Sequence, residues 1–455
     1  MKTPRVWTLL GAGLLSLLGA LLPGCVHEAH PVPECPERAV AFVGVNVVPM
    51  DTERVLTDHT VIVRDGHIAA LGPSGSITVP EDAERIDGKG RYLMPGLADF
   101  HVHLTSDEQL LSFLAHGVTS VFDLDGSPGH VELQGALARN ERFGPTLYAS
   151  SPRVDGDPPV FGDTVVTVGS PEQARKAVVL QKLAGYKALK VYDNLTPEVY
   201  AILMAMARQQ KLPVVGHVPR KVGLEAVLRA RQSLISDGEE YFLTASRDES
   251  RLPALVRATK EAGTSVVPGL SRLATTQRML EDLEGVFADP EARYLHPSVM
   301  RDWRGSNPTR RVDVAAFIER ERQAYPFVRN LTLGLQKEGA RLLLGTDSAR
   351  AGLFPGKAAH GELAELVKAG LTPFEALATG TRNAGAFITE HVDPAARFGT
   401  VALGQRADLL LLPGNPLEDV GHASRSLGVM VRGQWLPREQ VQRMRERAAA
   451  AFPKR

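Results

Sequence analysis

The amino-acid sequence predicts an α/β protein in which a (β/α)8 TIM barrel carries a small composite β-sandwich domain built from both chain ends. Between about residues 95 and 394, short apolar runs alternate with helical stretches, a pattern typical of repeated βα units around a parallel sheet. The flanking segments, residues 39–94 and 395–455, are instead rich in strand-like runs and turns, and they match each other in this character.

The barrel strands are predicted from short apolar runs, and eight such strands close a barrel of this kind. The runs are Leu97–Leu104, Val118–Leu124, Thr146–Ser150, Ala188–Tyr192, Val214–Val218, Leu234–Asp237, Ser265–Leu270 and Arg341–Asp347. The segment from about 272 to 328 is longer than one crossover helix requires. We therefore expect a helical insertion over the barrel mouth.

The two flanks supply the strands of the second domain. In the N-terminal flank, two strand-like runs meet at Asp65-Gly66, a pair of residues that favours a tight hairpin. The C-terminal flank contains apolar runs at 407–412 and 429–433, and we expect it to end in a helix.

Residues 1–24 have the features of a signal peptide, with Lys2 and Arg5 before an uncharged apolar stretch. The sequence Leu-Pro-Gly-Cys at 22–25 resembles a bacterial lipobox, which predicts that Cys25 is lipidated. The proline-rich residues 25–38 are predicted to form a tether. An ordinary cleaved signal peptide or a short membrane anchor is the alternative. We expect export and lipid anchoring to the bacterial cell envelope, on the outer membrane or the periplasmic side.

The composition excludes several classes of protein. In 455 residues, 44% are hydrophobic and 23% are charged, which are ordinary globular values and argue against disorder. The chain has 52 Lys and Arg against 52 Asp and Glu, so no basic field recruits nucleic acid. We expect no nucleic-acid partner, and membrane contact through the lipid anchor only.

Two histidines stand at the end of the first barrel strand. His101 and His103 are two residues apart, so both imidazoles face the same side of a strand. A pair of neutral imidazoles in a barrel mouth suits metal binding, although a histidine pair buried in the core is the alternative.

Three further polar residues stand at the ends of other strands. Lys190 lies in the fourth strand, at a position where a buried apolar residue would be expected. His217 ends the fifth strand, and Asp347 ends the eighth. Alone, each could be a cap, a turn residue or, for Lys190, a solvated edge lysine. Together they are expected to converge, since active sites of such barrels lie at the carboxyl ends of the strands.

The motifs MPGLADFHVHL, KVY, VVGHVP, LLLGTDS and GTRNAG, in this order, resemble the amidohydrolase superfamily. Its most similar branch contains imidazolonepropionase-like enzymes, Xaa-Pro dipeptidases and ochratoxin-type amidases. The resemblance covers about residues 39–438 and includes the two-ended β-sandwich. It implies that His101, His103 and Asp347 bind one divalent ion. It also implies that a carbamylated Lys190 bridges this ion to a second ion bound by His217, so that the chain holds two Zn²⁺ or Mn²⁺ ions.

One position departs from the family pattern. Where the sixth strand usually ends in histidine, this chain has Asp237, aligned by the following Gly-Glu-Glu-Tyr. A carboxylate is a harder ligand and adds a negative charge, which favours Mn²⁺ over Zn²⁺ or weakens the second position.

The resemblance also indicates residues that meet the substrate. Tyr192 lies two residues beyond Lys190 and on the same strand face. His360 follows the eighth strand, although a place on a helix surface is the alternative. Arg153 and Arg350 lie in mouth loops, where they would pair with a substrate carboxylate or remain solvated.

The function implied is hydrolysis of an amide, peptide (dipeptide or Xaa-Pro-like) or cyclic-amide C–N bond in a small molecule. The nucleophile is a metal-activated hydroxide, and Asp347 transfers the proton. The alternatives are a one-metal deaminase or cyclic amidohydrolase, and a binding lipoprotein that has lost catalysis. A homo-oligomer is a common form among similar proteins.

Overall fold

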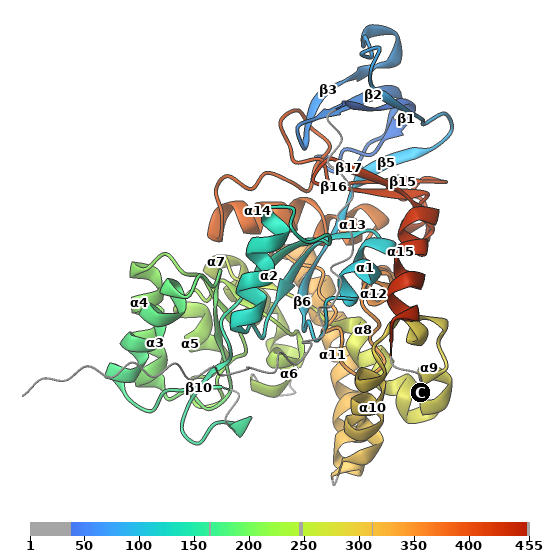
Figure 1. Cartoon of the computed structure of the whole chain (residues 1–455). Coiled ribbons are helices and arrows are strands. Elements are labelled where there is room, and N and C mark those ends of the chain that lie inside the picture. Colours follow the sequence, from blue (N-terminus) through green and yellow to red (C-terminus); the bar gives the residue numbers. More distant parts are fainter. Residues whose placement is uncertain (1–37, 163–164, 245–248, 312, 453–455) are drawn as a thin grey trace, which may run out of the picture.

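The computed structural model describes residues 38–162, 165–244, 249–311 and 313–452 (Figure 1). The predicted signal peptide, the lipidated Cys25 and the tether up to residue 37 lie outside these ranges. Within them, no helix combines the length and apolar character needed to cross a bilayer.

Both ends of the chain contribute to one eight-stranded sheet, as expected for a composite domain (Figure 1). Its strands are β1 (Val40–Val47), β2 (Leu56–Arg64), β3 (His67–Pro73), β4 (Glu84–Asp87), β5 (Tyr92–Pro95), β15 (Leu409–Leu412), β16 (Gly428–Val431) and β17 (Gln434–Pro437). The ends join where β15 pairs antiparallel with β5. The predicted hairpin is present: β2 and β3 meet at Asp65 and Gly66, whose φ angles of 50° and 75° suit a tight turn.

Strand β15 is buried on both faces, which explains its unbroken run of leucines. Leu409 and Leu411 pack into the sheet's own core with Phe42, whereas Leu410 and Leu412 join the core of the barrel. Because alternate side chains of a strand point to opposite faces, this one strand docks the terminal sheet onto the barrel.

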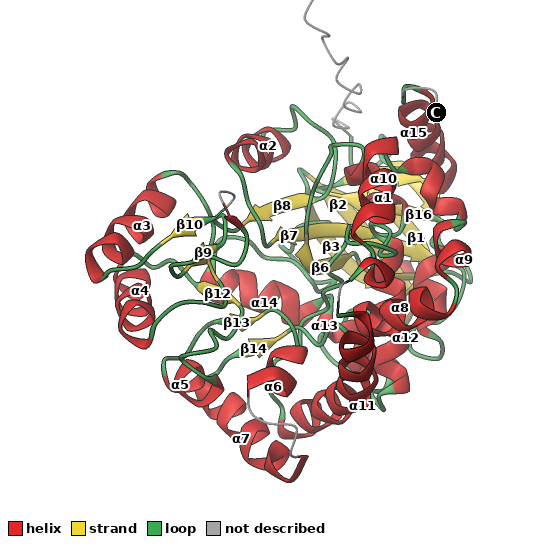
Figure 2. Ribbon diagram, turned by 90° about the horizontal axis from the view of Figure 1, so that it is seen from below, coloured by secondary structure: helices red, strands yellow, loops and turns green. Residues whose placement is uncertain are grey.

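Seven short strands form the barrel wall: β6 (Leu97–Val102), β7 (Val118–Asp123), β8 (Thr146–Ala149), β11 (Leu189–Val191), β12 (Val214–Gly216), β13 (Leu234–Ile235) and β14 (Ser265–Val266). They form two parallel sheets, β6-β7-β8 and β11-β12-β13-β14, the second extended by β9 (Val154–Asp155) and β10 (Val166–Thr167). Single parallel bridges at Ser150–Ala188, Val266–Leu342 and Val102–Ser348 link these sheets through the predicted eighth strand into a ring (Figure 2). Backbone hydrogen bonds join the eighth segment to β6, from Phe100 N–H to the Leu344 carbonyl at 2.8 Å and from Asp347 N–H to the His101 carbonyl at 2.7 Å.

Most helices of the βα units lie around this ring in Figure 2, whereas the helix Arg382–His391 lies across its centre in that view and packs Phe387 against Phe100 of β6. The helices are α1 (Gln109–Ala115), α2 (Pro128–Ala138), α3 (Pro171–Leu183), α4 (Pro197–Gln209), α5 (Leu224–Arg229), α6 (Glu239–Thr244), α7 (Leu252–Ala262), α12 (Lys357–Lys368), α13 (Pro373–Thr379) and α14 (Arg382–His391). Local sequence sets several starts. Ser170 and Thr196 cap α3 and α4 by accepting backbone N–H bonds, and proline follows each of them.

The segment expected as an insertion is helical. It contains α8 (Leu270–Glu281), α9 (Leu283–Phe287), α10 (Pro297–Ser306) and α11 (Val314–Glu338). Its last helix runs on to Glu338, since α11 also serves as the helix before the eighth barrel segment. The insertion packs against the loop after Asp347, where the indole N–H of Trp303 donates to the carbonyl of Ala349 at 3.0 Å. The described chain finishes with α15 (Arg438–Ala450), beside α1.

Candidate metal centre

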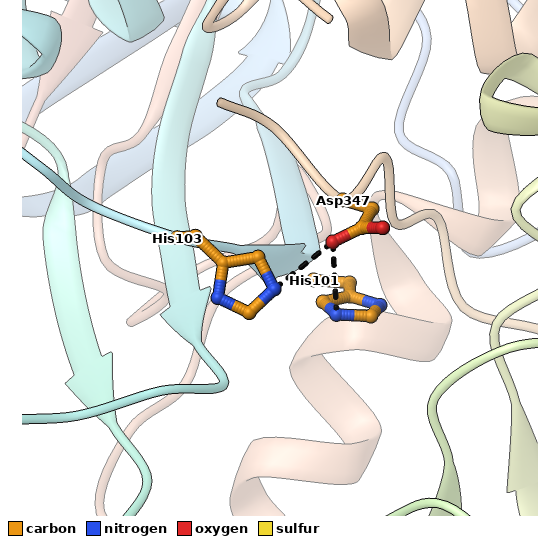
Figure 3. Close-up of side chains that lie close together, drawn as sticks. All are labelled: His101, His103 and Asp347. Carbon is orange, nitrogen blue, oxygen red and sulfur yellow. Dashed lines mark ion pairs between the residues drawn. The ribbon is translucent and has the colours of Figure 1, made fainter. Parts of the chain in front are cut away.

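His101, His103 and Asp347 lie together at the carboxyl ends of β6 and the eighth segment (Figure 3). Asp347 Oδ1 is 2.9 Å from His103 Nε2 and 3.4 Å from His101 Nε2. Figure 3 shows both rings turned toward this one oxygen. The sequence prediction that these three residues meet agrees with this geometry.

A buried carboxylate that the sequence analysis missed holds the two segments in register. Asp99 Oδ1 accepts the backbone N–H of His101 at 3.2 Å and that of Thr346 at 3.0 Å. Its Oδ2 accepts the Thr346 hydroxyl at 2.6 Å, and burial raises the pKa of Asp99 to about 7. The sequence offered one indication of this role, because Asp99 is an acidic residue among the apolar residues at the start of β6.

The electrostatics of this group suit a cation. Burial, reinforced by the charge of Lys190, lowers the pKa of His101 well below its ordinary value and keeps its ring neutral. Burial opposes ionisation of Asp347, but the charge of the adjacent Arg350 guanidinium, the largest opposing influence, and the contact with His103 hold the pKa of Asp347 well below the usual range.

The hydrogen bonding of Asp347 gives an independent test of fit. Its Oδ1 is buried and, among the described residues, receives no hydrogen bond of normal geometry despite the two nearby rings. Buried polar atoms are rarely left without a partner. Two imidazoles and an anionic oxygen without a donor are the ligand set that Zn²⁺ or Mn²⁺ takes, so the residues fit an ion.

A second group adjoins the first. Asp237 Oδ1 lies 3.6 Å from His101 Nδ1, and its Oδ2 lies 3.8 Å from His217 Nε2. Burial raises the pKa of Asp237, and Asp347 adds to this effect. Burial lowers the pKa of His217, helped by Lys190. Asp237, which stands where the family pattern has a histidine, therefore faces His217 at the end of the fifth strand.

Lys190 is inside the barrel and is 1% exposed, so the alternative of a solvated edge lysine is wrong. Its Nζ donates to Ser236 Oγ at 3.3 Å. Burial lowers the pKa of the Lys190 amine, although Asp237 and Asp347 oppose the shift.

Two carboxylates orient His217, and the sequence analysis missed both. His217 Nδ1 lies 2.9 Å from Asp193 Oδ1 and 3.2 Å from Glu240 Oε1. With Nδ1 held in this way, Nε2 is the nitrogen that points to Asp237. Partners of this kind fix the tautomer and the direction of a ligating histidine.

We expect Asp193→Asn to reduce turnover by roughly 10- to 100-fold, since the amide no longer offers a charged acceptor to His217 Nδ1. Steady-state kinetics at saturating metal would measure the effect. Glu198→Gln, which changes an exposed carboxylate on α4, is the matched control. Wild-type turnover in Asp193→Asn would show that the orientation of His217 is unimportant.

The expected substrate residues lie at the rim of the site, with one exception treated below. The Tyr192 ring is 4.1 Å from the His217 ring. The Arg153 guanidinium lies 5.7 Å from the Tyr192 ring and 4.4 Å from that of Phe161, which the sequence analysis missed. Arg350 pairs with Asp347 Oδ2 at 3.1 Å, and its side chain is 63% exposed.

His360 belongs to a different part of the molecule. Its Nε2 contacts the carbonyl oxygen of His116 at 2.8 Å, and it lines a cavity between α12 and the insertion. None of the metal-centre residues lines that cavity. The helix that carries His360 starts only at Lys357, and its packing turns this ring toward α1. The expectation that His360 lines the substrate pocket is corrected accordingly.

The model of the Amidohydrolase family matches residues 92–436, so the chain belongs to that family. The resemblance seen in the motifs is thereby confirmed. Among curated relatives, an adenine deaminase of Ruegeria sp. (strain TM1040) is 39% identical over 80 residues, which are 16% of this chain and 13% of that protein. An imidazolonepropionase of Stenotrophomonas maltophilia (strain R551-3) is 40% identical over 62 residues, 13% of this chain and 15% of that protein.

Solved structures are similar over almost the whole chain. A bottromycin amidohydrolase is 27% identical with a TM-score of 0.72, and the match covers 92% of both chains. A putative prolidase from Bifidobacterium longum is 24% identical with a TM-score of 0.70, covering 90% of this chain and 99% of that one, which shows the fold alone. By contrast, the chain spans only 13% and 15% of the length of the two curated relatives.

Proposed function

We propose that this protein is a metal-dependent hydrolase that cleaves an amide, dipeptide-like or cyclic-amide C–N bond of a small molecule. The convergence of His101 and His103 on the unsatisfied Oδ1 of Asp347 carries the proposal. The similarity to a bottromycin amidohydrolase over 92% of both chains supports the same class of reaction.

His101, His103 and Asp347 would hold the first ion, and Lys190, His217 and Asp237 would hold a second. A divalent ion in this position supplies Lewis acidity, which makes water a nucleophile near neutral pH and polarises the substrate carbonyl. The depressed pKa of Lys190 favours the neutral amine that reacts with CO₂ to form a carbamate.

The chain's own residues move the proton and orient the substrate. Asp347 is ionised, so it accepts the proton from water and delivers it to the leaving amine. The Arg153 guanidinium lies 5.7 Å from the Tyr192 ring, and the exposed guanidinium of Arg350 stands next to Asp347. Both arginines would pair with a substrate carboxylate, Arg153 in competition with its present partner Asp125 and Arg350 in competition with Asp347.

Deamination is the second candidate, favoured by the identity to an adenine deaminase within one 80-residue segment. The two candidates differ in product, because a deaminase releases ammonia and an amidase releases an amine and a carboxylic acid. The buried Lys190 favours the amidase, since the resemblance associates a buried lysine at this position with carbamylation.

A substrate panel tests the proposal. We expect the metal-loaded protein to hydrolyse members of a panel of N-acyl amino acids, Xaa-Pro and other dipeptides, and cyclic amides, with amine release followed by mass spectrometry. A chelator should abolish the activity, and added Mn²⁺ or Zn²⁺ should restore it. Ammonia release from adenine without amide cleavage would favour the deaminase, and no turnover of any C–N substrate would contradict both.

Lipidation of Cys25 and anchoring to the cell envelope remain part of this proposal, supported by the signal-peptide pattern of residues 1–25.

A further inference from the structure

A network of charged side chains joins the end of β13 to the helical insertion. Arg272, in the first turn of α8, has its Nε 3.9 Å from Asp237 Oδ1 and its Nη1 4.0 Å from Glu321 Oε2. Its Nη2 forms an ion pair with Glu239. Arg320 completes the network, with its Nε 3.6 Å from Glu239 Oε1 and its Nη2 3.1 Å from Glu321 Oε1. The Arg272 side chain is only 16% exposed.

The position of Arg272 is fixed by the backbone that carries it. Helix α8 begins after Gly269, whose φ is 67°, a left-handed conformation that suits glycine. The buried carboxylate of Glu362 then accepts the backbone N–H groups of Leu270 at 3.1 Å and Ser271 at 2.6 Å. These contacts fix the start of the helix, and the ion pair with Glu239 holds the guanidinium beside Asp237.

The carboxylate of Asp237 faces His101 and Ser236 as well as His217 and Arg272, and its Oδ2 accepts the Ser236 hydroxyl at 3.2 Å. Its Oδ2 faces His217 Nε2 at 3.8 Å, as two ligands of one ion would, while its Oδ1 faces the Arg272 Nε at 3.9 Å. A fixed positive charge so close to a ligand repels a divalent ion bound by the same carboxylate, and low solvent access leaves this repulsion poorly screened. Among the described residues, the ion pairs of Arg272 are with Asp237, Glu239 and Glu321, and the charge of Asp347 acts on it as a weaker influence.

Charge counting over the network gives the direction of the effect. With all five side chains ionised, Asp237, Glu239 and Glu321 carry three negative charges against two positive charges on Arg272 and Arg320, so one negative charge remains for a cation. Removing the charge of Arg272 would leave two. The affinity of the position between His217 and Asp237 should therefore rise when Arg272 becomes neutral.

We infer that Arg272 makes the second metal position weak, so that the chain retains one ion at His101, His103 and Asp347 and binds a second only at elevated metal concentration. This inference rests on the proposed metal-dependent function. Arg272 does not bind the ion itself, and its charge lowers the metal affinity of the second position through Asp237. The metal concentration then decides what fraction of the protein holds both ions.

The test is metal stoichiometry and affinity of the full chain. After dialysis against metal-free buffer, wild type should retain about one ion per chain by mass spectrometric metal analysis, and calorimetric titration with Mn²⁺ should reveal a second, weaker event. In Arg272→Gln the second dissociation constant should fall at least about tenfold. In Arg272→Lys, which keeps the charge, it should stay near wild type.

Glu239→Gln is the converse variant. It removes the carboxylate that pairs with Arg272, so more of the guanidinium charge acts on Asp237 and the second event should weaken. This variant keeps the inference testable if Arg272→Gln does not fold, which circular dichroism would show.

Several outcomes would overturn the inference. Two ions bound by wild type with equal dissociation constants would overturn the inference and leave the proposed function intact. Equal second affinities in the Gln and Lys variants of Arg272 would also do so, because the charge would then be irrelevant. No retained ion in wild type would overturn the inference and the proposed function together.

Discussion

Replacing Asp347 by asparagine should lower turnover by roughly 10²- to 10⁴-fold, the range expected when a general acid–base group is removed. The amide is nearly isosteric but cannot accept a proton, and its neutral oxygen is a poorer partner for a cation between His101 and His103. The steady-state rate with the best substrate from the amide panel is the measurement. Far-UV circular dichroism should show an unchanged fold.

Asp82→Asn is the matched control, since it makes the same chemical change at an exposed carboxylate outside the barrel. Its rate should equal that of wild type. If Asp347→Asn also turned over substrate at close to the wild-type rate, the proton-transfer role assigned to Asp347 would be wrong.

Replacing Lys190 by alanine should remove one ion at metal concentrations that fill both positions, because the buried amine is the group whose carbamate would bridge them. The substitution also leaves a space beside Ser236, where the lysine Nζ now donates. A short carboxylic acid such as formate or acetate should enter this space and partly restore both metal binding and turnover. Metal analysis with and without the acid is the measurement.

Lys176→Ala, on the exposed face of α3, is the control and should bind metal as wild type does. Full metal content in Lys190→Ala would rule out a bridging role for this lysine. Loss of metal without rescue by any small acid would argue that the amine supports the site by charge and packing alone.

Strand periodicity made much of the centre predictable. His101 and His103 share one face because they are two residues apart, and the ends of parallel strands meet at one edge of a barrel. For the same reason, the position of Asp347 opposite both histidines followed from its place at the end of the eighth run. The composite terminal domain was also predicted, since the two flanks showed the same strand-like pattern.

Other features depend on contacts that sequence spacing does not encode. Asp193 lies in the loop after β11 and Glu240 lies in α6, where the packing of the fourth and sixth βα units turns them toward His217 in the fifth. Asp99 was hidden in an apolar run. The position of His360 was predicted wrongly, because the direction in which α12 presents this side chain depends on the contacts of α12 with α1 and the insertion. The bounds of the strands also differ, since hydrogen bonding between distant segments, and not hydrophobicity, decides where pairing stops.

The contact between Arg272 and Asp237 also depends on tertiary packing and could not be predicted from sequence spacing. The sequence shows the missing sixth-strand histidine, but Arg272 lies 35 residues further along the chain and comes back to Asp237 only through the start of α8.

The most direct test of the central claim is the metal content per chain of the purified full-length protein after reconstitution with Mn²⁺ or Zn²⁺ and removal of excess ion. The account predicts at least one tightly held ion, which is lost when His101 and His103 are both replaced by alanine. Absence of any retained ion, or unchanged metal content in that double variant, would contradict a metal centre at these residues and favour a binding protein without catalytic activity.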